Sequence, residues 1–140
     1  LVSVRDLTVR FTGGARPVHA VNGVSFDIAA GEVLGVLGES GSGKSVTLRA
    51  LLRILPERRT RIAGDVRIAG KDVLALSGEA LDQYRGGTTA MIFQEPMLAF
   101  DPVYTVGHQI AESIRRHARV GTAEARRRAI AMLEHVRIPS

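Results

Sequence analysis

Residues 38–45 read Gly-Glu-Ser-Gly-Ser-Gly-Lys-Ser and match the pattern G-x-x-x-x-G-K-[ST] at every fixed position. The stretch follows an apolar run at residues 33–37 and precedes a helix-like run at residues 45–55, which Pro56 would end. A buried strand, a glycine-rich turn and a helix in this order predict a loop that binds phosphate. A glycine-rich turn without a ligand would have no need of Lys44, one of only two lysines in the chain.

The residue types of this stretch explain how it would hold a nucleotide. Its three glycines let the backbone approach a ligand closely and turn successive N–H groups inward. Lys44 is expected to reach the β- and γ-phosphates as a point charge, and the Ser45 hydroxyl to ligate Mg²⁺. Ser40 and Ser42 are either ligands or small polar residues that fit the loop. The predicted nucleotide-binding residues here are Gly38, Glu39, Ser40, Gly41, Ser42, Gly43, Lys44, Ser45 and Val46.

Composition limits the class of protein. A chain of 140 residues has the length of one domain, and 45% hydrophobic residues are enough for a core. The absence of cysteine excludes a disulfide framework and a thiolate zinc site. No apolar stretch is long enough to span a bilayer, and no signal peptide is visible at the start. We therefore expect a soluble, cytoplasmic protein.

The net charge of +5 comes almost entirely from arginine, which gathers at residues 58–61, 115–119 and 126–128. Such clusters can mark a nucleic-acid surface. Aromatic residues make up only 4% of the chain and do not alternate with the arginines, so the stacking platforms of nucleic-acid binders are missing. Two clusters fall on alanine-rich helical segments, where charge usually marks a solvated face. We predict no nucleic-acid partner.

Hydrophobic periodicity predicts the order of the elements. Strands are expected at residues 2–11, 18–28, 33–37, 62–68 and 89–93. Helices are expected at residues 79–84 and 106–118 and after an N-cap at Thr122, with a loop over residues 94–104. This order predicts an α/β fold in which a strand-rich start changes to helices near residue 105, with a subdomain boundary in the loop at residues 94–104.

Three features in the same order resemble the ATP-binding subunit of ABC transporters. Phe11 ends the opening strand, the phosphate loop follows, and Met91-Ile92-Phe93-Gln94-Glu95-Pro96-Met97 resembles the Q-loop of that family. Residues 100–110, Phe-Asp-Pro-Val-Tyr-Thr-Val-Gly-His-Gln-Ile, are similar to the branch that imports oligopeptides, dipeptides and nickel. The resemblance covers essentially the whole chain. It implies a P-loop NTPase core with an N-terminal antiparallel β subdomain and the start of an α-helical subdomain. Residues 1–104 would form the partial ATP-binding core, with the β subdomain, phosphate loop and Q-loop, and residues 105–140 the beginning of the helical subdomain.

The resemblance implies roles for two further residues. Phe11 would stack on the adenine face; alternatively it is an ordinary strand aromatic. Gln94 would contact Mg²⁺ or the attacking water, which makes it a catalytic residue with Lys44 and a metal-site residue with Ser45. The alternative interpretation of Gln94 is a solvated loop amide.

The resemblance also implies cofactors and partners. ATP and Mg²⁺ would bind, and the full-length protein would be an ATPase that drives import of peptides or a related solute. The loop after Gln94 would contact membrane-spanning transporter subunits, and a second ATP-binding subunit would complete a dimer. The protein would lie peripherally on the cytoplasmic face of the plasma membrane.

The chain also departs from the pattern of this family. No LSGGQ signature, no Walker B strand ending in Asp-Glu and no switch histidine follow Gln94. Residues 76–79, Leu-Ser-Gly-Glu, precede the Q-loop and are interpreted as a turn and helix entry. The sequence thus resembles the N-terminal half of a nucleotide-binding domain. We expect these residues alone to bind nucleotide without completing hydrolysis.

Two other classes of protein share the phosphate loop. A non-transport ABC ATPase acting on nucleic acid would be supported by zinc-ligand cysteines or a basic linker, and the absence of cysteine and residues 100–110 argue against it. A P-loop kinase would need an arginine-rich lid, and a GTPase an N-K-x-D motif. The chain has no N-K-x-D, and the Q-loop has no counterpart in either class.

Overall fold

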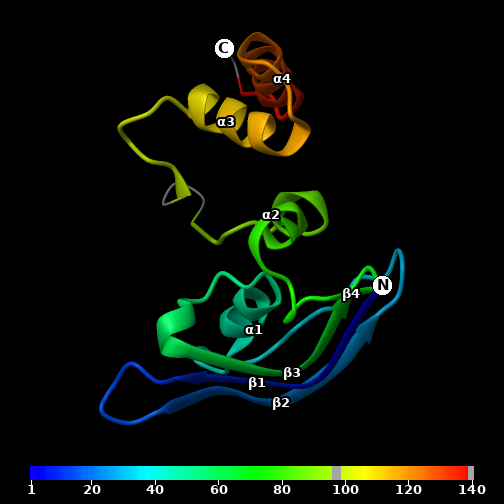
Figure 1. Ribbon diagram of the computed structural model, residues 1–140, viewed down its shortest axis with the longest axis vertical. Helices are drawn as coiled ribbons and strands as arrows, with labels where there is room; N and C mark the ends of the chain where they lie inside the picture. Colours follow the sequence, from blue (N-terminus) through cyan, green and yellow to red (C-terminus); the bar gives the residue numbers. More distant parts are fainter. Residues whose placement is uncertain (96–98, 139–140) are drawn as a thin grey trace. The chain divides into compact units, whose positions relative to one another are not determined.

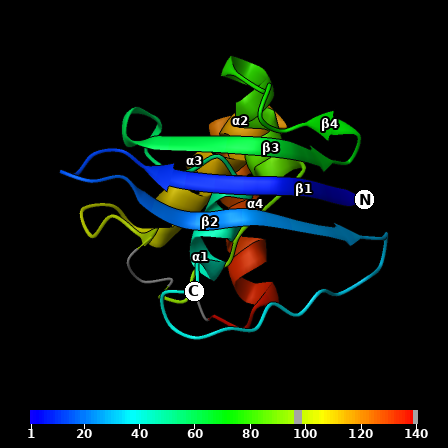
Figure 2. The same ribbon diagram turned by 90° about the horizontal axis from the view of Figure 1, so that it is seen from below.

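The first strand of the chain lies inside an antiparallel sheet. The computed structural model describes residues 1–95 and 99–138. The sheet contains β1 (Val2–Phe11), β2 (Val18–Ile28), β3 (Thr60–Ile68) and β4 (Lys71–Asp72). Their order is β2-β1-β3-β4, so β1 pairs with β2 on one side and β3 on the other (Figure 2). The predicted hairpin of β1 and β2 is confirmed with the same bounds, and the strand predicted at residues 62–68 is confirmed as β3, with two more residues at its start.

A β-bulge explains why the apolar pattern of β1 is irregular. Val4 and Leu7 are three residues apart, yet both are fully buried. Between them the pairing shifts register, and Asp6 adopts a left-handed φ of 48°. On β3, Gly64 lies against this bulge with a φ of +124°, and a Cβ there would be 2.7 Å from the Arg5 carbonyl oxygen. Only glycine therefore fits at this crossing.

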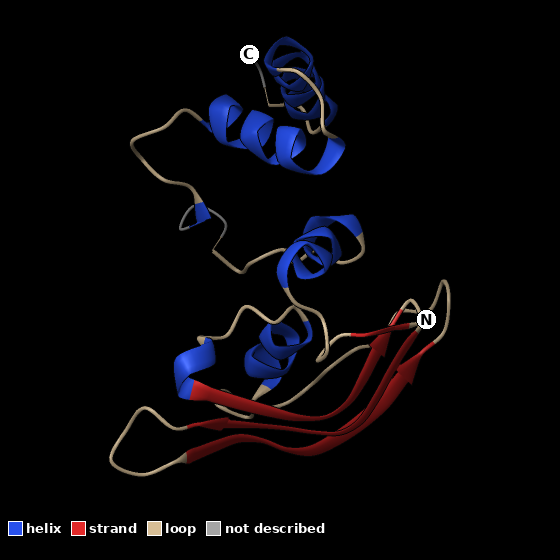
Figure 3. Ribbon diagram, in the orientation of Figure 1, coloured by secondary structure: helices blue, strands red, loops and turns tan. Residues whose placement is uncertain are grey.

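Two helices cover one face of the sheet (Figure 1; Figure 3). They are α1 (Lys44–Leu51) and α2 (Gly78–Gly87), and a 3₁₀ turn, η1 (Glu57–Arg59), precedes β3. The core between sheet and helices consists of Val4, Leu7, Val9, Val21, Ala50, Leu55, Val66, Ile68, Val73, Leu81 and Tyr84. These elements belong to one compact unit, Leu1–Thr89, and the rest of the chain forms a second, Ala90–Ser140. The predicted division after residue 104 stays a prediction.

Three sequence expectations about this unit and the segment after it were wrong. The helix expected to reach residue 55 ends at Leu51, because Arg53 turns the chain with a left-handed φ of 56°. Residues 33–37 form no strand, and Val33 and Leu37 are 93% and 96% exposed. Residues 89–93 form no strand beyond one bridge at Thr89. A strand needs a neighbour for its backbone groups, and within the described residues neither run has a ladder partner.

The second unit contains a pair of helices. They are α3 (Val106–Ala118), whose predicted bounds are confirmed, and α4 (Thr122–His135). Buried alanines meet at their contact, with partly buried aliphatic side chains around them: Ala111, Ala125, Ala129, Ile110, Ile114 and Val120. Because alanine side chains are small, the two helix backbones can approach closely here. No helix among the described residues combines the length and apolar character that crossing a bilayer requires.

The two helices of the second unit differ at their N-termini, which gives a stability prediction. Thr105 caps α3, and its hydroxyl accepts from the His108 backbone N–H at 3.3 Å. The sequence prediction that Thr122 caps α4 was wrong, because Gly121 holds the N-cap position and no side chain caps that helix. We expect Thr105→Ala to lower the free energy of unfolding by about 1 kcal/mol. Thr122→Ala is the matched control and should change it by less than about 0.5 kcal/mol in chemical denaturation; equal losses would contradict the assignment.

Candidate phosphate-binding site

The glycine-rich stretch forms an exposed loop that leads into the first helix. Residues 38–42 are exposed, and Gly43 is the N-cap of α1 with a left-handed φ of 91°. A Cβ on Gly43 would lie 2.4 Å from the Ala20 carbonyl oxygen of β2. The start of α1 is therefore seated directly against the sheet, and only a residue without a side chain allows this approach.

Lys44 holds the loop in a closed shape. Its Nζ donates hydrogen bonds to the Gly38 carbonyl at 2.5 Å and to the Glu39 carbonyl at 2.6 Å. A third bond runs to Ser42 Oγ at 3.2 Å. All three ammonium donors thus point at the loop itself. The positive charge lies inside the curve of the loop, which is where a phosphate group would need it.

The first turn of α1 presents backbone donors. The first i to i−4 bond of the helix runs from the Thr47 N–H to the Gly43 carbonyl at 2.8 Å, so the N–H groups of residues 44–46 precede the hydrogen-bond ladder. No side chain caps this terminus, and its first turn holds no acidic residue. Three N–H donors and the positive end of the helix dipole therefore favour an anion.

The other predicted loop residues have distinct surroundings. The Val46 side chain packs against the core, which leaves its backbone N–H for a ligand. Ser45 is exposed one position earlier. Glu39 and Ser40 are exposed as well, and the Glu39 carbonyl also accepts from the Ser42 N–H at 3.3 Å. Ser42 is thus more than filler of the loop, because it contacts both Lys44 and the Glu39 backbone.

The Ser45 hydroxyl fits Mg²⁺ in its chemistry. The described residues contain no group of three or more His, Cys, Asp or Glu side chains that could hold a metal. At this loop, Ser45, nucleotide phosphates and water would supply oxygen ligands to a metal, and the metal role of Gln94 stays a prediction. This is the ligand set that Mg²⁺ prefers, since it keeps several waters and bridges to phosphate.

Phe11 lies close to this loop through the sheet. It ends β1 and pairs with Val18 on β2, two residues before the Ala20 carbonyl that touches Gly43. Its ring is partly buried and packs against the core. The end of β1 and the start of α1 thus lie against neighbouring residues of β2, while adenine stacking stays a prediction.

Gln94 belongs to the second unit and is exposed at a bend. Its predicted catalytic and metal roles stay predictions. Pro96 and Met97 of the predicted Q-loop lie outside the described residues.

Sequence reasoning missed the role of Gln109. Its side-chain amide accepts from the Asp101 N–H at 3.0 Å and donates to the Asp101 and Tyr104 carbonyls at 2.9 and 3.0 Å. It therefore fixes the turn that leads into α3. The sequence signal for this role is the position of Gln109 in the first turn of α3, from which a side-chain amide can reach the preceding loop.

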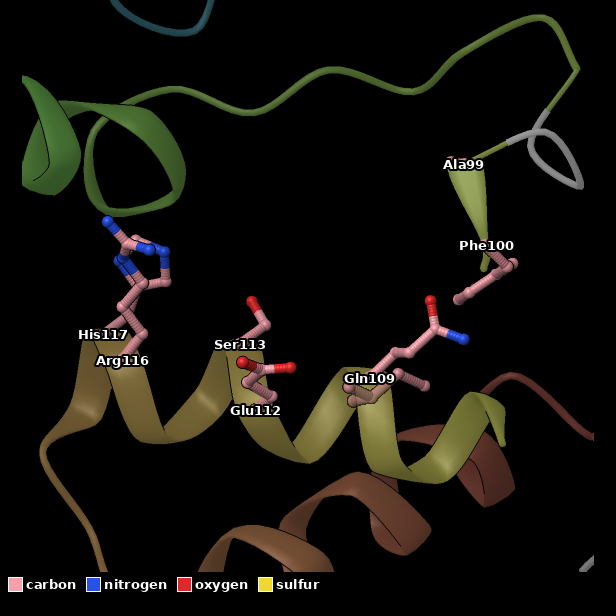
Figure 4. A pocket seen from close by; sticks show the side chains of 8 residues that line it. Ala99, Phe100, Gln109, Glu112, Ser113, Arg116 and His117 are labelled. Carbon is pink, nitrogen blue, oxygen red and sulfur yellow. The ribbon is translucent and has the colours of Figure 1, made fainter. Parts of the chain in front are cut away.

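A hollow of about 490 Å³ lies beside one face of α3, and Figure 4 shows the side chains that line it. Ala99 and Phe100 form its far side, and Gln109, Glu112, Ser113 and Arg116 line it from the helix. The lining carries both signs of charge and one aromatic ring. Such a surface suits a polypeptide partner better than a small apolar ligand.

Comparison with known proteins places the chain in one family. The sequence model described as ABC transporter matches residues 21–140. The chain is 46% identical over 139 residues to a probable peptide ABC transporter ATP-binding protein of Sinorhizobium fredii, covering 99% of this chain and 42% of that protein. It is 42% identical over 140 residues to a probable D,D-dipeptide transport ATP-binding protein of Escherichia coli, covering 99% of this chain and 43% of that protein.

A third relative and a solved structure extend the comparison. The oligopeptide transport ATP-binding protein OppD of Mycobacterium tuberculosis is 46% identical over 139 residues, which are 99% of this chain and 22% of that protein. The chain thus spans less than half the length of these relatives. A solved ATP-binding cassette, described as dimeric and in a post-hydrolysis state bound to ADP and Pi, matches with a TM-score of 0.78. That match has 24% identity and covers 96% of this chain and 56% of the other, which confirms the predicted fold.

Proposed function

Because the chain belongs to the ABC transporter family, we propose that it is the ATP-binding part of an importer for peptides or a related solute. The closed phosphate loop around Lys44 carries this proposal, since it sets a cation and three helix N–H donors at one exposed place. The relatives with names that state peptide, oligopeptide or dipeptide transport support the solute class.

We propose separate tasks for the residues around the nucleotide. The N–H groups of residues 44–46 and the Lys44 ammonium bind and neutralise the β- and γ-phosphates. Ser45 holds Mg²⁺, which supplies charge neutralisation on the phosphate oxygens when bound. Phe11 stacks on the adenine, and Gln94 orients the attacking water or the metal in the full-length protein.

We propose that residues 1–140 alone do not hydrolyse ATP. In-line attack of water on the γ-phosphate needs a group that positions the water and carboxylates that hold the metal. No Walker B strand ending in Asp-Glu occurs in this sequence. We therefore propose that residues 1–140 bind nucleotide and that hydrolysis belongs to the full-length protein.

We propose two protein partners for the full-length protein. Large apolar side chains flank the loop after Gln94 and are exposed, among them Ile92 at 95% and Val103 at 80%. Together with the hollow beside α3, they suit contact with a membrane-spanning subunit at the cytoplasmic face of the membrane. The solved cassette is described as dimeric, which supports a second ATP-binding subunit as the other partner.

The metal assignment gives a direct test of this function. We expect ATP to bind more tightly with Mg²⁺ than with EDTA, as measured by isothermal titration calorimetry. Ser45→Ala should remove most of that difference, a loss of about tenfold in the affinity for Mg²⁺–ATP, because one metal ligand is deleted. Ser113→Ala, at an exposed serine of α3 outside the loop, is the control. If neither form of ATP binds to the unaltered protein, the proposed function is wrong; if Ser45→Ala keeps the full Mg²⁺ effect, only the metal assignment is wrong.

A further inference from the structure

Two side chains of α2 occupy the carbonyl end of α1. The last carbonyls of a helix have no partner inside it. Tyr84 Oη donates to the Leu51 carbonyl at 2.7 Å, and Arg85 Nε donates to the Leu52 carbonyl at 2.9 Å. Arg85 Nη2 donates to the next carbonyl, that of Arg53. Three consecutive carbonyls are therefore held by one phenol and one guanidinium, which we call the α1 clasp.

The backbone of α2 is shaped to make this contact. The helix leaves regular geometry at Arg85, with ψ of 113°, and at Gly86, with φ of 90°. The Thr88 and Thr89 N–H groups both return to the Tyr84 carbonyl, at 3.1 and 3.0 Å. Tyr84 is fully buried, and burial raises the pKa of its phenol, so the hydroxyl stays a hydrogen-bond donor at neutral pH. The clasp is thus a rigid part of the core.

Arg53 ties the same helix end to a third segment. Its guanidinium donates to the Val73 and Leu74 carbonyls at 3.2 and 2.8 Å. It also pairs with Glu57 at 3.3 Å, and its side chain is only 17% exposed. The residue that ends α1 is therefore fixed through both its carbonyl and its side chain.

Fixing one end of a short helix determines where the other end lies. α1 has eight residues, which is about 12 Å of helix. Two turns of helix move as one body, so a rotation at the carbonyl end displaces the N–H groups of residues 44–46. A guanidinium at the C-terminus also interacts favourably with the helix dipole, whose positive end faces the phosphate site.

We propose that Arg85, supported by Tyr84, is a positioning residue for nucleotide binding: it holds α1 by its carbonyl end and thereby sets the phosphate-binding N–H groups. The expected effect of Arg85 on the affinity for Mg²⁺–ATP rests on the proposed function. The contact itself requires no nucleotide, which allows the two to be tested separately.

The nucleotide test compares variants of equal charge and equal stability. Arg85→Ala should weaken Mg²⁺–ATP binding about tenfold, because a charged two-point contact is lost. Arg67→Ala is the charge-matched control, since Arg67 is exposed on β3 and pairs with Asp65 of the same strand at 3.3 Å. Leu81→Ala is the stability-matched control, since it removes a buried side chain of α2 that makes no bond to α1. Both controls should bind within about twofold of the unaltered protein when measured well below the unfolding temperature.

The second measurement is amide hydrogen exchange without nucleotide. Arg85→Ala should speed exchange in α1, including the Thr47 N–H, while the paired strands β1 and β3 keep their protection. Arg85→Lys keeps the positive charge but loses the planar guanidinium with its two donating nitrogens, so its exchange rates in α1 should lie between those of the unaltered protein and Arg85→Ala. This variant replaces Arg85→Ala in the comparison if the alanine variant does not fold. Unchanged or uniformly faster exchange would overturn the positioning role. Selective exchange in α1 with unaltered ATP affinity would overturn its consequence for binding, whereas failure of the unaltered protein to bind ATP would overturn the proposed function alone.

Discussion

Replacing Lys44 by alanine is expected to weaken Mg²⁺–ATP binding about a hundredfold, which corresponds to about 2.7 kcal/mol. The Lys44 ammonium makes three bonds inside the loop, to the Gly38 and Glu39 carbonyls and to Ser42 Oγ. The variant therefore loses both the charge that would face the phosphates and the bonds that keep the loop closed. A hydrogen bond between charged groups contributes about 1.5–3 kcal/mol, so the expected loss in affinity corresponds to one contact between Lys44 and phosphate.

The other lysine of the chain provides the matched control. Lys71 on β4 is exposed and donates to Thr88 Oγ1 at 3.2 Å. Lys71→Ala changes the net charge by the same amount as Lys44→Ala and should leave ATP affinity unchanged. Calorimetry of both variants separates a specific phosphate contact from general attraction of an anion to a basic protein. Equal losses in the two variants would exclude Lys44 as a phosphate ligand.

A comparison of the unaltered protein with Lys44→Ala tests the proposal about turnover. Phosphate release from ATP by residues 1–140 should stay at the level of Lys44→Ala. Sustained release above that level would show that these residues contain a complete catalytic site.

The sequence predicted those elements whose partners are near in the chain or whose pattern is regular. β1 and β2 alternate and are joined by a short turn, and α3 has an amphipathic pattern; all three have their predicted bounds. The phosphate loop was predictable because each fixed residue of its motif has a local reason. Gly43, for example, has a left-handed φ and contacts the Ala20 carbonyl.

The errors have a common physical cause. The apolar runs at residues 33–37 and 89–93 have strand composition, but a strand forms only where a neighbour offers backbone hydrogen bonds. Composition does not report that neighbour. Within the described residues the first run is exposed and unpaired, and the second has a single bridge. The α1 clasp escaped prediction for a related reason, since its bonds join residues 32 and 33 positions apart in the chain.

Gly43→Ala is expected to remove measurable ATP binding and to lower the free energy of unfolding by about 3 kcal/mol. The added Cβ would lie 2.4 Å from the Ala20 carbonyl oxygen, and the two would have to separate by about 0.6 Å to reach 3.0 Å, a distance that real Cβ atoms essentially never undercut. Ala20 lies in β2 between His19 and Val21, which both pair with β1, so the sheet resists this movement. The start of α1 must move instead, and with it the donors that would hold the phosphates. Misplacement on this scale costs up to about a hundredfold in function.

Gly41→Ala separates this contact from the cost of backbone conformation. Gly41 and Gly43 have similar left-handed φ values, 83° and 91°, but a Cβ on Gly41 would have no atom within 4 Å. An alanine at either position takes on the cost of the left-handed conformation, about 1–2 kcal/mol, and only at Gly43 does the collision add to it. Chemical denaturation of both variants should therefore show a small loss of unfolding free energy for Gly41→Ala and a severe one for Gly43→Ala. Equal effects would mean that the contact with β2 does not determine the position of α1. In that case the phosphate site would depend on the conformation of its loop and on the clasp at the opposite end of the helix.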